Sequence, residues 1–249
     1  MTEAVRLEAV ALRYPSGGGI QPLSLTIAAG ETVALVGPSG AGKTTLLSLL
    51  AGEISPESGR VILHGRPLAA LAPGRELARL VGIMHQQFDL VPHLPVHSNV
   101  LAGRLGEWGL ARSLLSLLFP QDAGLARRAL ARVGLLDRWN ERTARLSGGE
   151  QQRVALARLL VQNPRILLAD EPVSSLDPAR AEDLLALLTG IAASDGKTLI
   201  ASLHSVGLAR RFFQRIIALR GGAVQFDRPA AAVGDDDLAR LYALAPAAE

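Results

Sequence analysis

A glycine-rich segment at residues 37–44 has the residue types and the spacing that suit phosphate binding. It follows the pattern Gly-x-x-x-x-Gly-Lys-Thr. In such loops, successive backbone N–H groups surround the phosphates, the lysine neutralises their outer charge and the hydroxyl ligates Mg²⁺. We therefore expect nucleotide phosphates to bind at Gly37, Pro38, Ser39, Gly40, Ala41, Gly42, Lys43, Thr44 and Thr45.

The segments on either side indicate how this loop is positioned. Residues 31–36 form a short β-branched apolar run, and residues 44–50 are compatible with a helix. A loop between a strand and a helix places its N–H groups at the positive helix end, as phosphate binding requires. Lys43 and Lys197 are the only lysines among 26 basic residues, so a lysine at this place is not compositional drift.

Two adjacent carboxylates follow an apolar run of strand length at residues 166–169. Such a run is typical of a buried parallel strand, and ligands bind at the carboxyl ends of those strands. We expect Asp170 to hold Mg²⁺, directly or through water, and Glu171 to polarise the water that attacks the γ-phosphate. The alternative is that these acids are ordinary turn residues at a strand end.

Residues 146–153 read Leu-Ser-Gly-Gly-Glu-Gln-Gln-Arg. Ser147 and Glu150 have the spacing of a capping box for a helix at about residues 149–162. The paired glycines, Gly148 and Gly149, also leave N–H groups and a positive helix end directed outward, which suits an anion. Both interpretations hold together.

Taken together, these motifs resemble the ATP-binding subunit of an ABC transporter, and the resemblance covers residues 5–244. It implies that Ser147, Gly148 and Gly149 contact the γ-phosphate held by a second copy, in a head-to-tail dimer that sandwiches ATP. Residues 174–177, Ser-Ser-Leu-Asp, resemble the D-loop, usually Ser-Ala-Leu-Asp, so Asp177 is expected to act in trans too.

Three further residues take their expected roles from this resemblance. Tyr14 resembles the aromatic residue that stacks on adenine, although its alternation with apolar neighbours also suits packing at a strand end. Gln86 resembles the glutamine that touches Mg²⁺ and senses the membrane partner. The unusual His85 before it leaves Gln87 as the other candidate. His204, after an expected strand at residues 198–202, resembles the histidine that contacts the γ-phosphate; otherwise it is a structural polar residue.

The resemblance implies an α/β fold of the P-loop NTPase type, with a RecA-like core, an N-terminal antiparallel β subdomain and an inserted helical subdomain. Residues 1–244 would form one domain, with the insert at about residues 88–160 and a short tail at 245–249. Within the insert, residues 126–133 have helical spacing, whereas residues 90–95 and 103–109 are irregular and rich in apolar side chains. We expect residues 101–120 to help dock a membrane subunit; the alternative is ordinary packing.

The C-terminal part is expected to form a helix near residues 206–213, two strands and a final helix that begins at residues 235–237. Because the chain then stops, we expect it to lack the regulatory domain that many importers of this family append.

Composition narrows the class of protein. The 249 residues are 49% hydrophobic, which allows a sizeable core, and no apolar run is long enough to span a bilayer. The sequence has no cysteine, which fits a reducing compartment. Its net charge is only +3, its arginines are scattered and aromatic residues make up 4%, so the composition does not favour nucleic acid as a partner. We expect the chain to stay in the cytoplasm, and the resemblance to ABC transporter subunits implies a peripheral protein on the cytoplasmic face of the inner membrane.

Several segments resemble the phosphonate importer branch of the family: residues 99–106, 112–115, 118–120, 202–204 and 208–211. This branch implies ATP and Mg²⁺ as cofactors, and a permease with a solute-binding protein as partners. Its solutes would be phosphonate, phosphite or hypophosphite. The alternatives are an importer for another small solute, such as a polar amino acid, or a soluble ABC ATPase acting in DNA repair or translation. The latter proteins usually carry a coiled-coil insertion or two fused ATPase units, which this sequence lacks.

Overall fold

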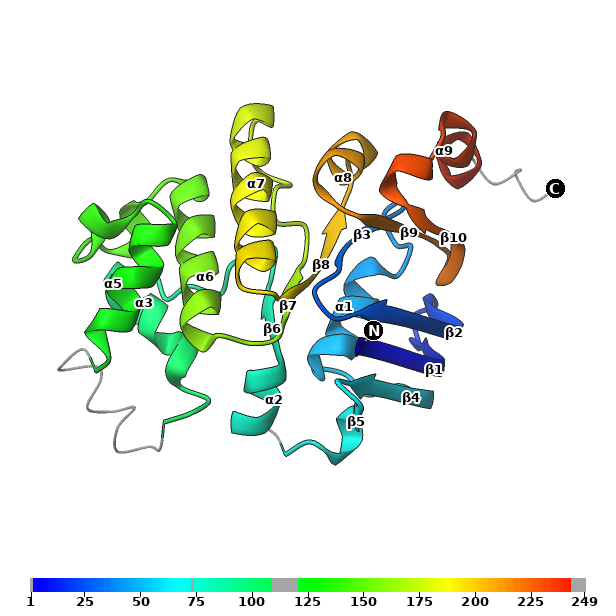
Figure 1. Ribbon diagram of the computed structural model, residues 1–249, viewed down its shortest axis with the longest axis horizontal. Helices are drawn as coiled ribbons and strands as arrows, with labels where there is room; N and C mark the ends of the chain where they lie inside the picture. The colour runs from blue at the N-terminus through cyan, green and yellow to red at the C-terminus, as the bar shows by residue number, and fades with distance from the viewer. Residues whose placement is uncertain (1, 73, 109–120, 243–249) are drawn as a thin grey trace.

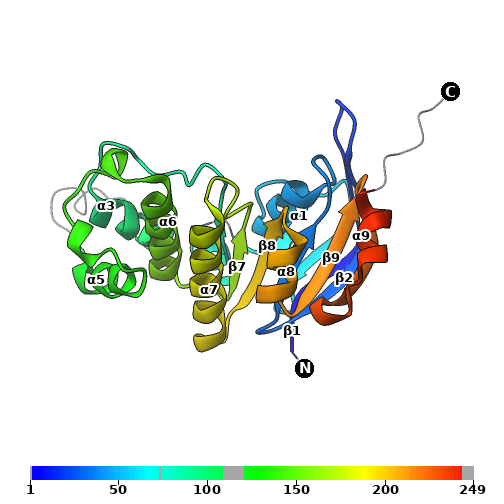
Figure 2. The same ribbon diagram turned by 90° about the horizontal axis from the view of Figure 1, so that it is seen from above.

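The computed structural model describes residues 2–72, 74–108 and 121–242, and its two β-sheets lie side by side (Figures 1 and 2). One sheet is antiparallel, with the strand order β2-β1-β4-β5. Its strands are β1 (Glu3–Arg13), β2 (Gly19–Ala28), β4 (Ser58–Leu63) and β5 (Arg66–Pro67). The expected N-terminal β region is therefore completed by strands that follow the first helix in sequence.

The second sheet has the strand order β10-β9-β3-β8-β7-β6. Only the β9–β10 pair is antiparallel, whereas the neighbours from β9 to β6 are parallel. The strands are β3 (Thr32–Val36), β6 (Val81–Met84), β7 (Ile166–Ala169), β8 (Thr198–Leu203), β9 (Arg215–Arg220) and β10 (Ala223–Pro229). Parallel order brings the carboxyl ends of β3, β7 and β8 to one edge of the sheet.

Helices cover both faces of this sheet. The α-helices are α1 (Lys43–Ala51), α2 (Arg75–Leu80), α3 (Val96–Leu101), α5 (Ala123–Arg132), α6 (Gly148–Gln162), α7 (Pro178–Ser194), α8 (Val206–Phe212) and α9 (Asp235–Tyr242). Short 3₁₀ turns lie at Leu68–Ala70, Ala102–Arg104, Leu136–Arg138, Thr143–Arg145 and Ala230–Ala232. In Figure 1, α3, α5 and α6 gather at one end of the molecule and α9 lies at the other.

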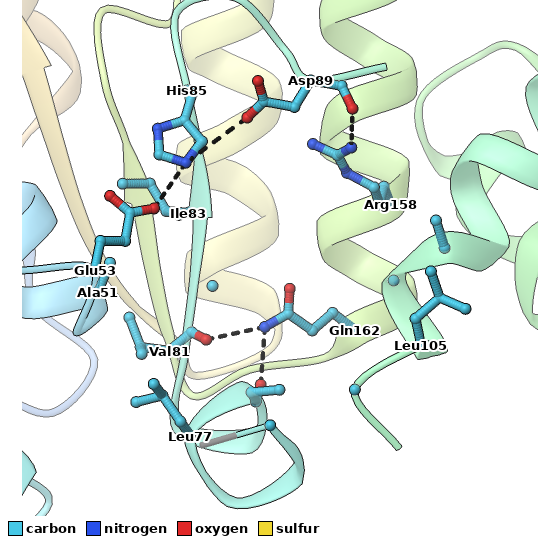
Figure 3. Close-up of a pocket in the computed structure, with 16 residues that line it drawn as sticks. Ala51, Glu53, Leu77, Val81, Ile83, His85, Asp89, Leu105, Arg158 and Gln162 are labelled. Atoms are coloured by element: carbon cyan, nitrogen blue, oxygen red, sulfur yellow. Dashed lines mark hydrogen bonds and ion pairs between the residues drawn. The ribbon is translucent and has the colours of Figure 1, made fainter. Parts of the chain in front are cut away.

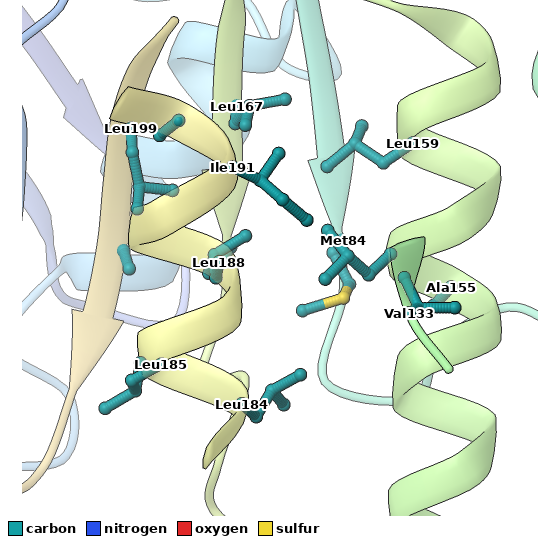
Figure 4. Close-up of a cluster of buried hydrophobic side chains, with 14 of the residues drawn as sticks. Met84, Val133, Ala155, Leu159, Leu167, Leu184, Leu185, Leu188, Ile191 and Leu199 are labelled. Carbon is teal, nitrogen blue, oxygen red and sulfur yellow. The ribbon is translucent and has the colours of Figure 1, made fainter. Parts of the chain in front are cut away.

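The strands of the parallel sheet separate two hydrophobic cores because successive side chains point to opposite faces. In β3, Val33 and Leu35 pack with α1 and the antiparallel sheet, whereas Ala34 and Val36 face the other helices. Figure 4 shows part of the second core, in which Leu188 of α7 and Leu159 of α6 gather near Met84. Burial on both faces explains why these strands read as continuous apolar runs.

The expected elements are confirmed within one or two residues at most ends. The strand after which the two carboxylates come is Ile166–Ala169, and the helix after the glycine pair runs from Gly148 to Gln162. Helix α5 begins three residues before the expected position, at Ala123. Residues 103 and 104, which were expected to be irregular, instead form a 3₁₀ turn together with Ala102.

The apolar stretch at residues 101–108 does not behave as one surface. Leu101 and Trp108 are buried in the core, whereas Leu105 is 47% exposed. Residues 109–120, which complete the stretch expected to dock a partner, lie outside the described residues. Across the described ranges, every helix is too short or too polar to cross a bilayer.

Candidate functional site

The phosphate-binding loop connects β3 to α1, as the sequence predicts. Gly37 has a φ of 148°, and a Cβ there would lie 2.0 Å from the Leu219 carbonyl oxygen on β9. Gly42 has a φ of 101° and precedes α1 without any side-chain cap. The first N–H groups of α1 are therefore left to an external acceptor such as a phosphate.

Lys43 folds back over this loop. Its side chain is buried, and Nζ donates hydrogen bonds to the carbonyl oxygens of Gly37 at 2.8 Å and Pro38 at 3.1 Å. Burial lowers the pKa of Lys43 from its ordinary value, while the nearby Glu171 and Asp170 oppose that shift. The two carbonyl contacts direct the ammonium group into the concave side of the loop.

Asp170 and Glu171 follow β7 at the expected sheet edge. The Asp170 N–H donates to the Met84 carbonyl at 2.8 Å, which continues the pairing of β6 with β7 by one residue. Glu171 has a φ of 47°, a left-handed conformation that residues with a Cβ rarely adopt. Strain of this kind persists only where neighbouring groups hold the backbone.

His204 lies just after β8 and contacts Glu171. Its Nε2 lies 2.5 Å from Glu171 Oε1, so the two residues with catalytic predictions are neighbours. Both line a cavity of about 600 Å³, together with Ser174 and Leu176 from the segment between β7 and α7. The imidazole is half exposed, which leaves it access to a ligand in this cavity.

Sequence analysis missed Ser202, which lies on β8 between these groups. Its side chain is fully buried, and its hydroxyl contacts both Asp170 and the backbone of Glu171. The only signal in the sequence is a hydroxyl residue within an apolar strand, two positions before His204.

Gln86 lies in the loop after β6, where its Nε2 is 3.5 Å from Ser174 Oγ of the expected D-loop. The next residues, Phe88 and Asp89, both have positive φ values, 59° and 45°. Arg158 of α6 holds them, since its guanidinium donates to both carbonyl oxygens at 2.7 Å. Sequence analysis also missed this link between the glutamine loop and the helix of the glycine pair.

The capping box before α6 is confirmed. Ser147 N–H donates to Glu150 Oε2 at 2.9 Å, and Glu150 N–H donates to Ser147 Oγ at 3.4 Å. The Ser147 N–H and hydroxyl lower the pKa of Glu150 from its ordinary value. The space around the Cβ position of Gly148 is open, and that of Gly149 meets Leu176 at 3.6 Å, so the glycine pair is approachable from outside.

The remaining candidates lie at chain turns. Asp177 caps α7, accepting a hydrogen bond from the Arg180 N–H at 3.1 Å. Tyr14 follows β1 in the turn to β2 and is 37% exposed. Its ring is therefore not enclosed by the core, and adenine stacking stays a prediction.

The candidate metal ligands offer oxygen atoms of the kind that Mg²⁺ prefers. Asp170 uses Oδ1 to accept the Ser202 hydroxyl, which leaves Oδ2 for another partner. Gln86 donates through its amide nitrogen, which leaves its carbonyl oxygen. With the hydroxyl of Thr44 at the start of α1, this donor set fits Mg²⁺.

A separate groove is lined by residues of α2, β6, the glutamine loop and α6 (Figure 3). Its volume is about 560 Å³, and its apolar lining includes Leu77 of α2 and Leu105. His85 Nε2 lies 2.9 Å from Glu53 Oε1 at one end. The glutamine loop thus contributes to two sites: His85 lines the groove, and the adjacent Gln86 is a candidate residue of the nucleotide site.

The two sheets, the phosphate-binding loop between β3 and α1 and the helix that begins at the glycine pair are the features expected of an ABC ATPase. The ABC transporter family profile matches residues 20–174. The chain therefore belongs to the ABC transporter family, as an ATP-binding subunit of the ATP-hydrolysing class.

The names of similar proteins specify a narrower group within this family. The phosphonates import ATP-binding protein PhnC of Pseudomonas putida is 49% identical over 242 residues, covering 96% of this chain and 90% of that protein. PhnC 1 of Pseudomonas aeruginosa is 48% identical over 243 residues, covering 96% and 91%. The dimeric, ADP- and Pi-bound ATP-binding cassette MJ0796 has a TM-score of 0.78 and 31% identity, covering 92% of this chain and 100% of that chain.

The catalytic role assigned to Glu171 can be tested by substitution. We expect Glu171→Gln to retain ATP binding and lose hydrolysis by about 10²-fold or more, the scale for removal of a positioned base. Steady-state phosphate release and equilibrium binding of a fluorescent ATP analogue measure the two effects. Near-normal turnover would remove Glu171 from the catalytic role.

Lys43→Ala serves as the contrasting variant in the same assays. It should weaken nucleotide binding itself, because the phosphates lose a charge-assisted hydrogen-bond partner. Unchanged affinity for ATP would contradict the role assigned to Lys43.

Proposed function

We propose that this chain is the ATP-hydrolysing subunit that energises an importer of phosphonates or related reduced-phosphorus oxyanions. The observation that carries this proposal is 49% identity to a phosphonates import ATP-binding protein across nearly the whole length of both chains. The contact between Glu171 and His204 supports the ATP-hydrolysing part of this proposal, because it brings together the two residues with predicted catalytic roles.

In the proposed reaction, the N–H groups of residues 37–44 and the Lys43 ammonium hold the phosphates, and Tyr14 stacks on adenine. Glu171 orients and polarises a water for in-line attack on the γ-phosphorus, and the bond to the leaving ADP oxygen breaks. His204 holds Glu171 and contacts the γ-phosphate. Mg²⁺, when held by Thr44, Gln86 and Asp170, would neutralise charge on the phosphate oxygens.

The site of one copy would be completed by a second copy. Ser147, Gly148 and Gly149 present an approachable helix start, and Asp177 lies in an exposed cap, so neither needs to serve its own phosphate loop. MJ0796, which has the same fold, forms a dimer as a cassette. We propose the head-to-tail arrangement, in which these residues contact the partner's ATP.

The groove beside His85 would receive the permease. It combines exposed Leu105 and partly buried Leu77 with the glutamine loop, so that a segment seated there contacts the loop that carries Gln86. Arg158 fixes the same loop to α6, so movement of the glycine pair is passed to the groove. We propose one domain at residues 1–244 with a helical insert at about 88–160, bound to the cytoplasmic face of the membrane through this contact.

Uptake measurements test the proposed solute. Cells that lack this chain but keep its natural partners should lose uptake of radiolabelled methylphosphonate or phosphite, and the wild-type chain should restore it. Glu171→Gln is the matched control, since it should be present and bind ATP without restoring uptake. Uptake of both compounds that is unchanged without the chain would contradict the proposal.

Mixed dimers test action in trans. Lys43→Ala on one subunit and Ser147→Arg on the other damage the two halves of one composite site and leave the second site whole. The same two changes on one subunit damage both sites. ATPase activity should therefore be higher for the first pairing, as measured on dimers purified through two different affinity tags. Equal activities would mean that Ser147 serves only as a helix cap.

A charge placed in the groove tests docking. Leu105→Asp should prevent co-purification with the permease while the isolated chain still binds ATP, because burial of an unpaired charge costs several kcal/mol. Leu136→Asp is the matched control, since Leu136 is similarly exposed, 43% against 47%, and lies outside the groove. Intact permease binding by Leu105→Asp would contradict docking at this site.

A further inference from the structure

Ser202 is enclosed within the parallel sheet and has both of its hydrogen-bonding functions in use. It is 0% exposed. The Glu171 N–H donates to Ser202 Oγ at 2.7 Å, and Ser202 Oγ lies 2.6 Å from Asp170 Oδ1. One hydroxyl therefore contacts both acidic residues of the nucleotide site.

The direction of these two hydrogen bonds follows from the groups themselves. A backbone N–H can only donate, so the serine oxygen must accept from Glu171. The serine O–H is then available to donate to Asp170 Oδ1. A hydroxyl that accepts and donates at once is polarised along the chain of bonds, which strengthens both.

The sheet register accounts for the position of this hydroxyl. Ala201 of β8 pairs with Ala169 of β7, so Ser202 is level with the first residue after β7, Asp170. On the other side, Ser202 pairs with Leu35 of β3, the strand that leads into the phosphate loop. Ser202 therefore connects Asp170, which follows β7, to β3, the strand that leads into the phosphate-binding loop.

The Glu171 backbone depends on the hydrogen bond from its N–H to Ser202 Oγ. Its φ of 47° is strained for a residue with a Cβ, and its side chain reaches His204, which lies two residues beyond Ser202, just after β8. Without an acceptor for its N–H, the partly buried amide would lose a hydrogen bond and the strained turn would lose its restraint.

We propose that Ser202 is a positioning residue for ATP hydrolysis, whose hydroxyl sets the Asp170 carboxylate and the Glu171 backbone in one fixed arrangement. Because the hydroxyl occupies Oδ1, Oδ2 of Asp170 would be available to hold Mg²⁺. By holding the turn, the hydroxyl directs the Glu171 side chain to the water. This inference rests on the roles proposed above for Asp170 and Glu171.

The chemistry requires a hydroxyl at this position, not merely a small side chain. Threonine supplies the hydroxyl and valine has nearly the same shape without it, so the pair Ser202→Thr and Ser202→Val separates hydrogen bonding from packing. Ser202→Ala adds a variant that cannot overpack the core. Ser202→Val and Ser202→Ala should behave alike.

The experiment uses the full-length chain and four measurements. These are kcat, KM for ATP, the Mg²⁺ concentration at half-maximal activity, and the dissociation constant of trinitrophenyl-ATP without Mg²⁺. Ser202→Val and Ser202→Ala should lower kcat by about 10- to 100-fold, the scale for misplacing a reacting group by about 1 Å. They should raise the half-saturating Mg²⁺ concentration and leave metal-free nucleotide binding unchanged. Ser202→Thr should keep kcat within about threefold, because it keeps the hydroxyl.

Thr198→Val is the matched control. Thr198 lies on the same strand, is also buried, and its hydroxyl accepts a hydrogen bond from the Gly30 N–H at 3.0 Å, away from the acidic edge. Its loss should lower the thermal midpoint without changing kcat or the Mg²⁺ dependence.

Equal kcat values for Ser202→Thr and Ser202→Val, or near-normal kcat for Ser202→Ala, would overturn the inference. So would a fall in kcat for Ser202→Val that is matched in full by Thr198→Val. Glu171→Gln separates this failure from that of the proposed function. If Glu171→Gln abolishes turnover while the Ser202 variants do not, only the role of Ser202 is wrong; if Glu171→Gln is active, the assignment of Glu171 is wrong.

Discussion

Parallel pairing of β3, β8 and β7 fixes where the residues of the candidate site can meet. Because these strands run in one direction, the residues that follow them meet at a single sheet edge. The edge brings together three distant parts of the chain: the phosphate loop, the Asp170–Glu171 pair and His204. A slip of one residue between β7 and β8 would turn every side chain of the displaced strand to the opposite face, and it would separate Ser202 from Asp170.

The site itself is held in conformations that a free chain would not keep. Gly37 and Gly42 have positive φ values, and a Cβ at Gly37 would collide with β9. Glu171 is left-handed without the freedom of a glycine, as are Phe88 and Asp89 in the glutamine loop. In both non-glycine cases a buried or half-buried side chain from another element, Ser202 or Arg158, bonds to the strained backbone. Tertiary hydrogen bonds therefore offset local backbone strain at the candidate nucleotide site and in the glutamine loop.

The same arrangement leaves two surfaces of one copy open to partners. The core on both faces of the sheet is closed, but the helix start at the glycine pair faces outward and the groove beside His85 has exposed apolar lining. Arg158 lies on the helix that begins at that glycine pair and holds the loop that borders the groove. In the proposed transporter, the partner's ATP and the permease would thus act on opposite ends of one connected unit.

Elements whose signals are local could be predicted from the amino-acid sequence. The glycine spacing, the apolar run before Asp170 and the capping box at Ser147 each lie within about ten residues, and the structure has the loop, the strand and the cap there. The catalytic and trans roles stay predictions. Three features became visible only in the folded chain. Ser202 bonds to residues 31 and 32 positions away, Arg158 reaches Phe88, and Leu101 is in the core while Leu105 is exposed. The reason is physical: a strand or helix period states which residues share a face, but which partner faces them depends on how distant segments are brought together.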